Sequence, residues 1–196
     1  MSNSVFDMSG RATLITGAAS GLGFAMAQSM AEAGASVCLT DIDGDGLEVA
    51  RDRLTQISNR VETQVLDVRD PARVKQVIKA FGARQGRLDA VFANAGITGG
   101  APISHREGEI ENIDLSLWQN VIDINLTGVF ATMQAAAAVM KPQKSGCIIC
   151  TASIAGMQTS SISGYAYSAT KAAVIHLVHL AAAELAPYNI RVNGIA

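Results

Sequence analysis

TGAASGLG, residues 16–23, follows the apolar run Ala12–Thr16 and opens a helical pattern at Leu22–Ala33. Glycines at a strand-to-helix turn permit a tight bend and bring backbone N–H groups close to a pyrophosphate at the helix N-terminus. The spacing is GxxxGxG rather than GxGxxG, so ordinary turn chemistry stays open as the alternative. The turn predicts a dinucleotide site with contacts from Gly17, Ser20, Gly21, Leu22 and Gly23.

Around this turn, short apolar runs alternate with longer helical patterns, which predicts βαβ units around a parallel sheet. The expected strands are Ala12–Thr16, Ser36–Thr40, Glu62–Leu66, Ala90–Ala93, Cys147–Thr151 and Ile190–Gly194. The expected helices are Leu22–Ala33, Gly46–Ile57, Pro71–Ala83, Leu115–Met140 and Tyr165–Ala186. Most of the strands are nearly continuous apolar runs, as in a sheet covered on both faces. We therefore expect an α/β fold, a doubly wound parallel sheet of the Rossmann type, in one domain over residues 1–196.

The composition favours a globular protein with a small-molecule partner. Of the 196 residues, 49% are hydrophobic and 16% are charged, which excludes intrinsic disorder. A net charge of −2 offers no basic surface for nucleic acid or for a membrane. The best membrane candidate, Ile124–Met140, is slightly short for a span and is interpreted as a buried helix. Three cysteines and an N-terminus without a signal-peptide pattern indicate the cytoplasm.

Asp41 ends the second expected strand, eighteen residues after Gly23. A carboxylate at this distance accepts hydrogen bonds from the adenine ribose hydroxyls and repels a 2′-phosphate, which favours NAD over NADP. The glycine turn also lacks Arg and Lys, the residues that could neutralise an additional phosphate. The alternative is that Asp41 or Asp43 only caps the next helix.

Tyr167 and Lys171 stand four residues apart in an expected helix, so their side chains project from the same face. A nearby positive charge favours the phenolate form of a tyrosine, which suits it to proton transfer. Taken alone, such a pair is common on helix surfaces. Tyr165 is a competing phenol, but Ala169 occupies the position four residues after it.

Together these motifs resemble the classical short-chain dehydrogenase/reductase family. The matching segments cover nearly the whole chain and are Thr16–Gly23, Leu66–Val68, Asn94–Gly96, Asn125, Ser153, Tyr167–Lys171 and Arg191–Ala196. The resemblance implies that Tyr167 exchanges a proton with the substrate oxygen and that Ser153 hydrogen-bonds to this oxygen. It also implies that Lys171 holds the nicotinamide ribose and favours the phenolate, while Asn125 positions a water linked to Lys171.

The resemblance further implies contacts to the rest of the cofactor. Asp67 and Val68 would contact the adenine, with Asp67 directed at its amino group and Val68 contributing its main chain. The floor of the cofactor site would be formed by Asn94, Ala95 and Gly96. Two alternatives stay open, because Ser153 can be an ordinary loop hydroxyl and Asn125 a helix-packing amide.

Two features depart from the family pattern. Ser153 and Tyr167 are fourteen residues apart, one more than expected for the family, and the flexible intervening loop can absorb the extra residue. The sequence ends at Ala196, where family members continue into a substrate-covering segment, another helix and a final strand. A chain truncated at its C-terminus, without that strand and lid, is therefore expected.

The predicted function is that of an NAD(H)-dependent oxidoreductase that interconverts a secondary alcohol and a ketone, with Tyr167 as general acid/base. The alternative is a nicotinamide-binding protein or a catalytically inactive fragment. Small residues at Ala135–Ala138 and Ala181–Ala183 allow close helix approach. In the resembling family these helices join subunits, so a homodimer or homotetramer is expected.

No metal site is expected. His176 and His179 lie one helical turn apart, but no acidic or cysteine cluster accompanies them. Cys147 and Cys150 face opposite sides of an expected strand and lie about 10 Å apart, too far for a disulfide.

Overall fold

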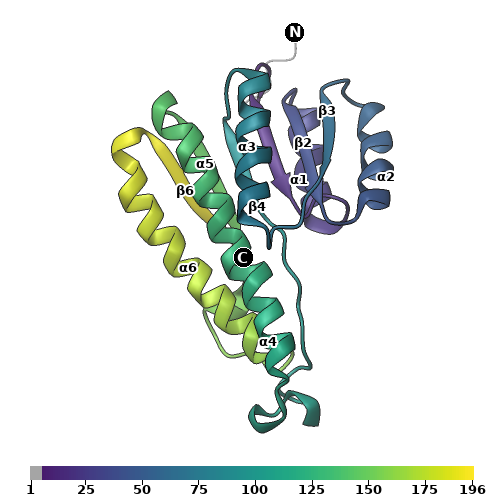
Figure 1. Cartoon of the computed structure of the whole chain (residues 1–196), viewed down its shortest axis with the longest axis vertical. Coiled ribbons are helices and arrows are strands. Elements are labelled where there is room, and N and C mark those ends of the chain that lie inside the picture. The colour runs from purple at the N-terminus through teal and green to yellow at the C-terminus, as the bar shows by residue number, and fades with distance from the viewer. Residues whose placement is uncertain (1–5) are drawn as a thin grey trace.

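The computed structural model describes residues 6–196. Residues 1–5 lie outside the described part. They belong to the expected domain and to the N-terminal stretch that shows no signal-peptide pattern. The strands are β1 (Ala12–Thr16), β2 (Ser36–Asp41), β3 (Val61–Val65), β4 (Ala90–Ala93), β5 (Gly146–Thr151) and β6 (Ile190–Ile195), of which Figure 1 labels β2, β3, β4 and β6. The α-helices are α1 (Gly21–Glu32), α2 (Gly44–Thr55), α3 (Pro71–Gln85), α4 (Leu115–Ile122), α5 (Val129–Gln143) and α6 (Tyr165–Leu185).

The strands form one parallel sheet in the order β3-β2-β1-β4-β5-β6. This order confirms the predicted doubly wound α/β fold. β1 pairs with β2 on one side and with β4 on the other, so the strand order reverses at β1. Ligands of such sheets bind outside the carboxyl ends of the strands at this reversal. The glycine turn that follows β1 lies at this point.

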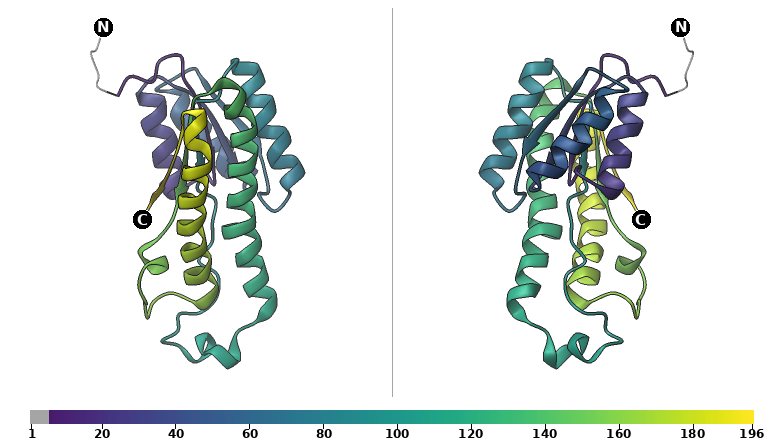
Figure 2. Two further views of the ribbon diagram at one scale, coloured as in Figure 1. Left: turned by 90° about the vertical axis from the view of Figure 1, so that its left-hand side faces the viewer. Right: turned by 90° about the vertical axis from the view of Figure 1, so that its right-hand side faces the viewer.

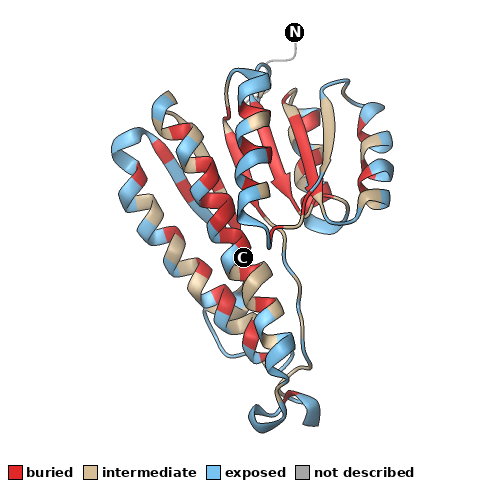
Figure 3. Cartoon of the chain, in the orientation of Figure 1, coloured by how far each residue is buried: buried red, intermediate tan, exposed pale blue. Residues whose placement is uncertain are grey.

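Helices cover both faces of the sheet (Figure 2). Buried residues of α3, α5 and α6 form one hydrophobic core with β4, β5 and β6. Buried residues of α1 and α2 form a second core against β1 and β2. All five residues of β1 are buried, and Figure 3 shows buried residues concentrated in the inner strands and on the sheet-facing sides of the helices. Burial on both faces explains the continuous apolar runs of these strands.

The helix predicted over Leu115–Met140 runs from Leu115 to Gln143 and contains a change in winding that the sequence did not predict. A π-helical segment, Asp123–Gly128, separates α4 from α5. The side chain of Asn125, inside this segment, hydrogen-bonds to the main chain of Ile97 across the site. Single-turn π segments inside helices are frequent at functional sites. This contact with Ile97 accompanies the change in helical winding.

Two helical stretches, Leu115–Gln143 and Tyr165–Tyr188, are long and apolar enough to cross a membrane by length and composition alone. Both stretches pack on the sheet, and half of the apolar window in the first is buried inside the protein. Core helices of soluble proteins have the same length and composition, so these stretches are weak evidence for a span. The place of Ile124–Met140 against α3 and the sheet fits its interpretation as a buried helix.

Candidate active site

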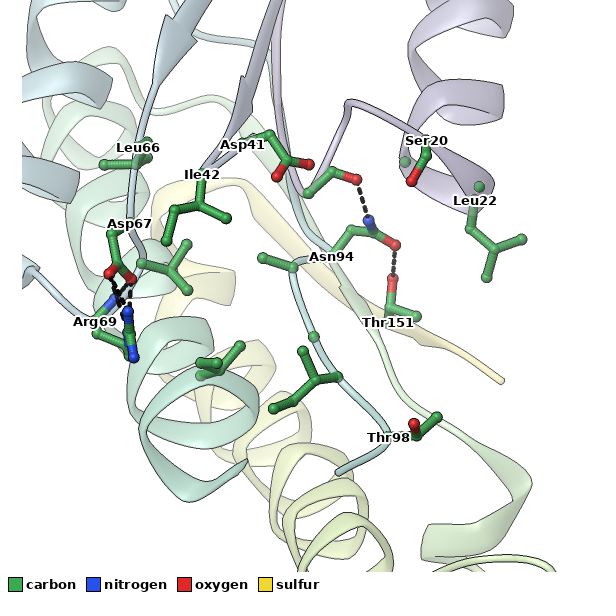
Figure 4. A pocket seen from close by; sticks show the side chains of 18 of the residues that line it. Ser20, Leu22, Asp41, Ile42, Leu66, Asp67, Arg69, Asn94, Thr98 and Thr151 are labelled. Atoms are coloured by element: carbon green, nitrogen blue, oxygen red, sulfur yellow. Dashed lines mark hydrogen bonds and ion pairs between the residues drawn. The ribbon is translucent and has the colours of Figure 1, made fainter. Parts of the chain in front are cut away.

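A cavity of about 560 Å³ opens at the carboxyl ends of the strands (Figure 4). It brings together side chains from the glycine turn, from the ends of β2, β3 and β4, and from α6. Every residue predicted to bind the cofactor lines it: Gly17, Ser20, Gly21, Leu22, Gly23, Asp41, Asp67, Val68, Asn94, Ala95, Gly96, Tyr167 and Lys171. The lining also includes Leu66, from the matching segment Leu66–Val68, and residues that the sequence did not single out, namely Ile42, Arg69, Ile97, Thr98, Asn120, Ile124 and Thr151.

The glycine turn requires glycine for two different reasons, which Gly17 and Gly23 illustrate. Gly17 has a φ of +67°, a conformation that other residues rarely adopt. A Cβ on Gly23 would collide with the carbonyl oxygen of Gly17 and with the Asn94 amide. α1 can therefore begin directly at the cavity, where its N-terminal N–H groups are suited to bind an anion.

Asn94 joins three neighbouring strand ends. Its Nδ2 donates to the carbonyl oxygens of Thr16 at 3.0 Å and Gly17 at 3.2 Å. Its Oδ1 accepts a hydrogen bond from Thr151 Oγ1 at 2.9 Å (Figure 4). Side-chain hydrogen bonds between the ends of β1, β4 and β5 thus fix the floor of the cavity.

Asp41 faces the cavity and also orients the glycine turn. Its Oδ2 accepts from the backbone N–H of Ala19 at 3.0 Å, and its Oδ1 accepts from the N–H of Asp43 at 3.1 Å. Asp43 is the N-cap of α2, because its carboxylate accepts from the N–H of Gly46 at 2.9 Å. The helix-capping alternative therefore applies to Asp43, while Asp41 keeps lone pairs available toward the cavity.

Asp67 forms an ion pair that the sequence analysis missed. Nη2 of Arg69 donates to Asp67 Oδ2 at 2.7 Å, and Nε donates to both carboxylate oxygens at 3.0 Å. The side-chain hydrogen bond from Arg69 lowers the pKa of Asp67 below its usual value. The Asp-x-Arg spacing in LDVRD was the only local signal for this pair.

Tyr167 and Lys171 line the cavity from one face of α6. Lys171 Nζ is 5.5 Å from the centroid of the Tyr167 ring and donates to the carbonyl oxygen of Thr151 at 2.6 Å. Lys171 is buried, and this desolvation lowers the pKa of its ammonium. Tyr165, at the start of the helix, is 39% exposed.

Asn125 and Ser153 are the two predicted catalytic residues outside the cavity lining, as far as residues 6–196 describe it. The amide of Asn125 is buried and is bonded in both directions to Ile97, at 2.8 Å to its N–H and 2.8 Å to its carbonyl oxygen. This pairing matches the packing amide that was the alternative for Asn125, and it fixes the chain that follows β4.

Ser153 follows β5 and caps the short 3-10 turn Ile154–Gly156. Its hydroxyl oxygen accepts from the N–H of Ala155 at 3.2 Å, which leaves its O–H available as a donor. A Cβ on Gly156 would collide with the backbone of Lys171, so this turn lies directly against α6. Ser153 is thus held on a segment packed beside the Tyr167–Lys171 helix.

Comparison with known proteins identifies the relationship. The family model described as "short chain dehydrogenase" matches residues 11–196. The chain belongs to the short-chain dehydrogenase family. As a member of this family, the chain is an oxidoreductase. The resemblance drawn from the glycine turn and the Tyr–Lys pair is confirmed.

Members of the short-chain dehydrogenase family with similar sequences span most of this chain. Levodione reductase of Leifsonia aquatica is 37% identical over 189 residues, covering 95% of this chain and 68% of the relative. (-)-trans-Carveol dehydrogenase of Rhodococcus erythropolis is 36% identical over 203 residues, covering 95% and 69%. The crystal structure of NAD+-bound xylitol dehydrogenase superimposes with a TM-score of 0.89 at 33% identity, covering 96% of this chain and 70% of that one.

The remaining groups that suggested other chemistry in this short-chain dehydrogenase lie outside the cavity. Cys147 and Cys150 are free thiols, and burial raises the pKa of Cys150 to about 12. The rings of His176 and His179 are 6.5 Å apart on α6. Residues 6–196 hold no group of three or more His, Cys, Asp or Glu side chains placed to bind a metal.

Proposed function

We propose that the chain is an NAD(H)-dependent oxidoreductase that interconverts a secondary alcohol and a ketone. The observation that carries the proposal is the cavity itself, which runs from Asp41 and the glycine turn to Tyr167 and Lys171. A ribose-binding carboxylate, a phosphate-binding helix end and a phenol–ammonium pair thus share one space, as a dinucleotide and its substrate require.

The residues around the cavity fit NAD. The N-terminus of α1 and the open space beside Gly21 suit the pyrophosphate, since a Cβ there would meet nothing within 4 Å. Asp41 would accept hydrogen bonds from the hydroxyls of the adenine ribose. Lys171 has three N–H donors, of which Thr151 takes one, so the other two would hold the nicotinamide ribose. When bound, NAD supplies the hydride acceptor or donor.

Tyr167 would handle the proton of the reaction. In oxidation the phenolate takes the proton from the alcohol oxygen, and in reduction the phenol returns one to the carbonyl oxygen. The ammonium of Lys171 would favour the phenolate. The O–H of Ser153 would donate to the substrate oxygen while negative charge develops on it. Asn125 would act indirectly. Its two hydrogen bonds to the main chain of Ile97 would hold one wall of the cavity in place.

The relatives support this reaction type. Their names describe a reductase of levodione and a dehydrogenase of trans-carveol, and one similar structure is an NAD+-bound xylitol dehydrogenase. We propose accordingly that residues 1–196 act as one dinucleotide-binding and catalytic unit in the cytoplasm, on a small molecule, without nucleic acid or membrane as partner.

The test combines binding and turnover. NADH should bind with enhanced nicotinamide fluorescence, and a panel of secondary alcohols should contain substrates that reduce NAD. NADH binding without turnover of any panel member would favour the binding-protein alternative, and absence of NADH binding would contradict the proposal.

Replacing Asp41 should change the choice of cofactor. In the parent protein, NAD should give a higher kcat/KM than NADP. Asp41→Ala removes the ribose hydrogen bonds and the repulsion of a 2′-phosphate, and Ile42→Arg adds a phosphate partner beside it. Each change should move the NAD/NADP ratio of kcat/KM by about 1–3 kcal/mol, or roughly 5- to 150-fold.

Asp43→Ala is the matched control for Asp41, because the Asp43 side chain caps α2 and the backbone N–H that Asp43 donates to Asp41 is kept in the variant. It should lower the unfolding temperature slightly and leave the NAD/NADP ratio unchanged. Equal kcat/KM for NAD and NADP in the parent protein would contradict the assignment of Asp41.

We also propose that α5 and α6 join two copies of the chain. A mainly apolar cavity of about 420 Å³ lies between them, lined by Leu126, Thr127, Phe130, Ala173, His176 and Leu177. Phe130 is 49% exposed and Leu180 57% exposed on these helices. Sedimentation at micromolar concentration should show a homodimer or homotetramer that Phe130→Glu dissociates, and a purely monomeric parent protein would refute it.

A further inference from the structure

Two segments beside Tyr167 carry no charged side chain. One runs from β4 into the loop after it, residues 91–104, and the other is the stretch 145–170, which contains β5, Ser153 and the start of α6. Neither segment contains Asp, Glu, Lys, Arg or His, and the structure describes every residue of both. These segments therefore offer hydroxyl groups, backbone dipoles and apolar side chains, but no partner for an ion.

The two uncharged segments pack against each other just before Tyr167. The N–H of Ile103 donates to the carbonyl oxygen of Ser163 at 3.4 Å. A Cβ on Gly164, the N-cap of α6, would lie 3.1 Å from the carbonyl oxygen of Ala101. The segments thus meet three residues before Tyr167, and a carbonyl oxygen rather than a cation stands beside the start of α6.

The cavity itself holds no cation that is free for a substrate. Within residues 6–196, the cationic side chains that line it are Arg69 and Lys171. Arg69 is paired with Asp67, and the ammonium of Lys171 donates to the carbonyl oxygen of Thr151. The two remaining N–H groups of Lys171 are those proposed to hold the nicotinamide ribose.

Residues 105–114, HREGEIENID, form an acidic loop that leads into α4. The loop contains four carboxylates and one guanidinium, and most of it is exposed (Figure 3). A Cβ on Gly108 would collide with the backbone of Ala101 and Pro102, so the acidic loop packs on the uncharged segment that meets the start of α6. No ion pair formed within residues 6–196 includes a carboxylate of this loop. The loop therefore adds a negative potential on this side of the protein.

Both features act against an anionic substrate. A carboxylate or phosphate that enters between the uncharged segments loses water and gains no ionic partner, which is unfavourable. The acidic loop repels the same groups as they approach, over a range of about 8 Å at physiological ionic strength. A neutral substrate meets neither obstacle.

We propose that the substrate of this site is an uncharged secondary alcohol or ketone, without a carboxylate, phosphate or sulfate group. This inference rests on the proposed function, since it requires Tyr167 and Ser153 to receive the substrate oxygen. The uncharged segments would then contact the part of the substrate beyond the reacting carbon, and the acidic loop would select against anions.

The test compares secondary alcohols that differ only in one charge. 4-Hydroxycyclohexanecarboxamide and 4-hydroxycyclohexanecarboxylate have nearly the same size and shape, and 3-hydroxybutyramide and 3-hydroxybutyrate form a smaller pair. The best neutral substrate of the alcohol panel is compared with its carboxylate and phosphate analogues in the same way. With saturating NAD, kcat/KM of the parent protein should be at least ~10²-fold higher for the neutral member, because the charge has no partner in the site.

The contribution of the acidic loop is tested by the triple variant Glu107→Gln/Glu109→Gln/Glu111→Gln. At low ionic strength it should raise kcat/KM for the carboxylates by a few-fold and leave kcat/KM for the amides and the NADH affinity unchanged. High salt should abolish this gain, because exposed charges are screened. The preference of the parent protein for the neutral member should persist in high salt, since the uncharged segments cause most of it.

The matched control is Glu32→Gln/Glu48→Gln/Asp52→Asn, which removes three exposed carboxylates from α1 and α2. It should change kcat/KM for neither member of a pair. An acidic-loop variant that alters amides and carboxylates equally would contradict the part given to the loop.

The outcomes distinguish this inference from the proposed function. Equal kcat/KM for an amide and its carboxylate in the parent protein, or a best substrate that is a carboxylate or a phosphate ester, would overturn the inference and leave the proposed function intact. Absence of turnover with every neutral and anionic alcohol would contradict the proposed function and this inference together.

Discussion

Tyr167→Phe should lower kcat for alcohol oxidation by at least the ~10²–10⁴-fold that accompanies loss of a general acid/base. The substitution removes one oxygen and keeps the ring beside Lys171. NADH affinity should therefore stay nearly unchanged. Steady-state kinetics with NAD and a secondary alcohol, together with NADH titration, measure the two quantities separately.

Tyr165→Phe is the matched control, since it removes the same atom two residues earlier on the same helix. Tyr165 belongs to the first turn of α6 and is partly exposed, so its variant should keep normal turnover. A Tyr167→Phe protein with full activity, or an inactive Tyr165→Phe protein, would show that another phenol transfers the proton.

Lys171→Met should reduce kcat/KM by ~10²-fold or more and also weaken NADH binding, because the ammonium is proposed to serve both the phenol and the ribose. The same change should make the folded protein more stable, by about 1 kcal/mol, since an apolar side chain of similar length replaces a buried charge. Thermal unfolding and kinetics on one preparation test both effects.

The buried ammonium of Lys171 makes the free energy of unfolding depend on pH. Burial lowers the pKa of Lys171, so between the lowered value and the ordinary value of about 10.5 the unfolded chain binds more protons than the folded one. The stability contributed by Lys171 therefore rises with pH through that window. The stability advantage of Lys171→Met should be largest near neutral pH and shrink as the pH approaches 10.

Lys79→Met, on the exposed surface of α3, controls for loss of a lysine as such. It should change neither activity nor the pH dependence of unfolding. A Lys171→Met protein that is both active and less stable than the parent would contradict the role given to the buried ammonium.

Much of this fold could be predicted from local sequence patterns. The limits of β1 and β4 agree with the expected Ala12–Thr16 and Ala90–Ala93, and no end of the other strands differs from its expected position by more than one residue. A buried strand is a short run of consecutive apolar residues, so its position can be predicted without knowing its contacts in the fold. β3, Val-Glu-Thr-Gln-Val, is less apolar because it forms the edge of the sheet and is only half-buried.

The parts that sequence reasoning missed depend on contacts between distant residues. Arg69 meets Asn120 only after β3 and α4 have been brought together by the fold. The π-helical segment contains Asn125, whose side chain hydrogen-bonds to Ile97, 28 residues earlier in the chain. Local periodicity contains no information on either pairing. The Tyr167–Lys171 pair was predictable because four residues of helix are enough to align the two side chains.

The cavity unites segments from opposite ends of the chain, and this affects how the protein can be made. Gly17 leaves the ribosome about 150 residues before Lys171, a delay of roughly 8 to 30 s at typical rates of synthesis. The central strand β1 must wait for β4 before its second edge is paired, which raises the contact order and slows folding. A ligand bound in this cavity can therefore stabilise only the finished sheet, because the cavity does not exist while the earlier segments fold.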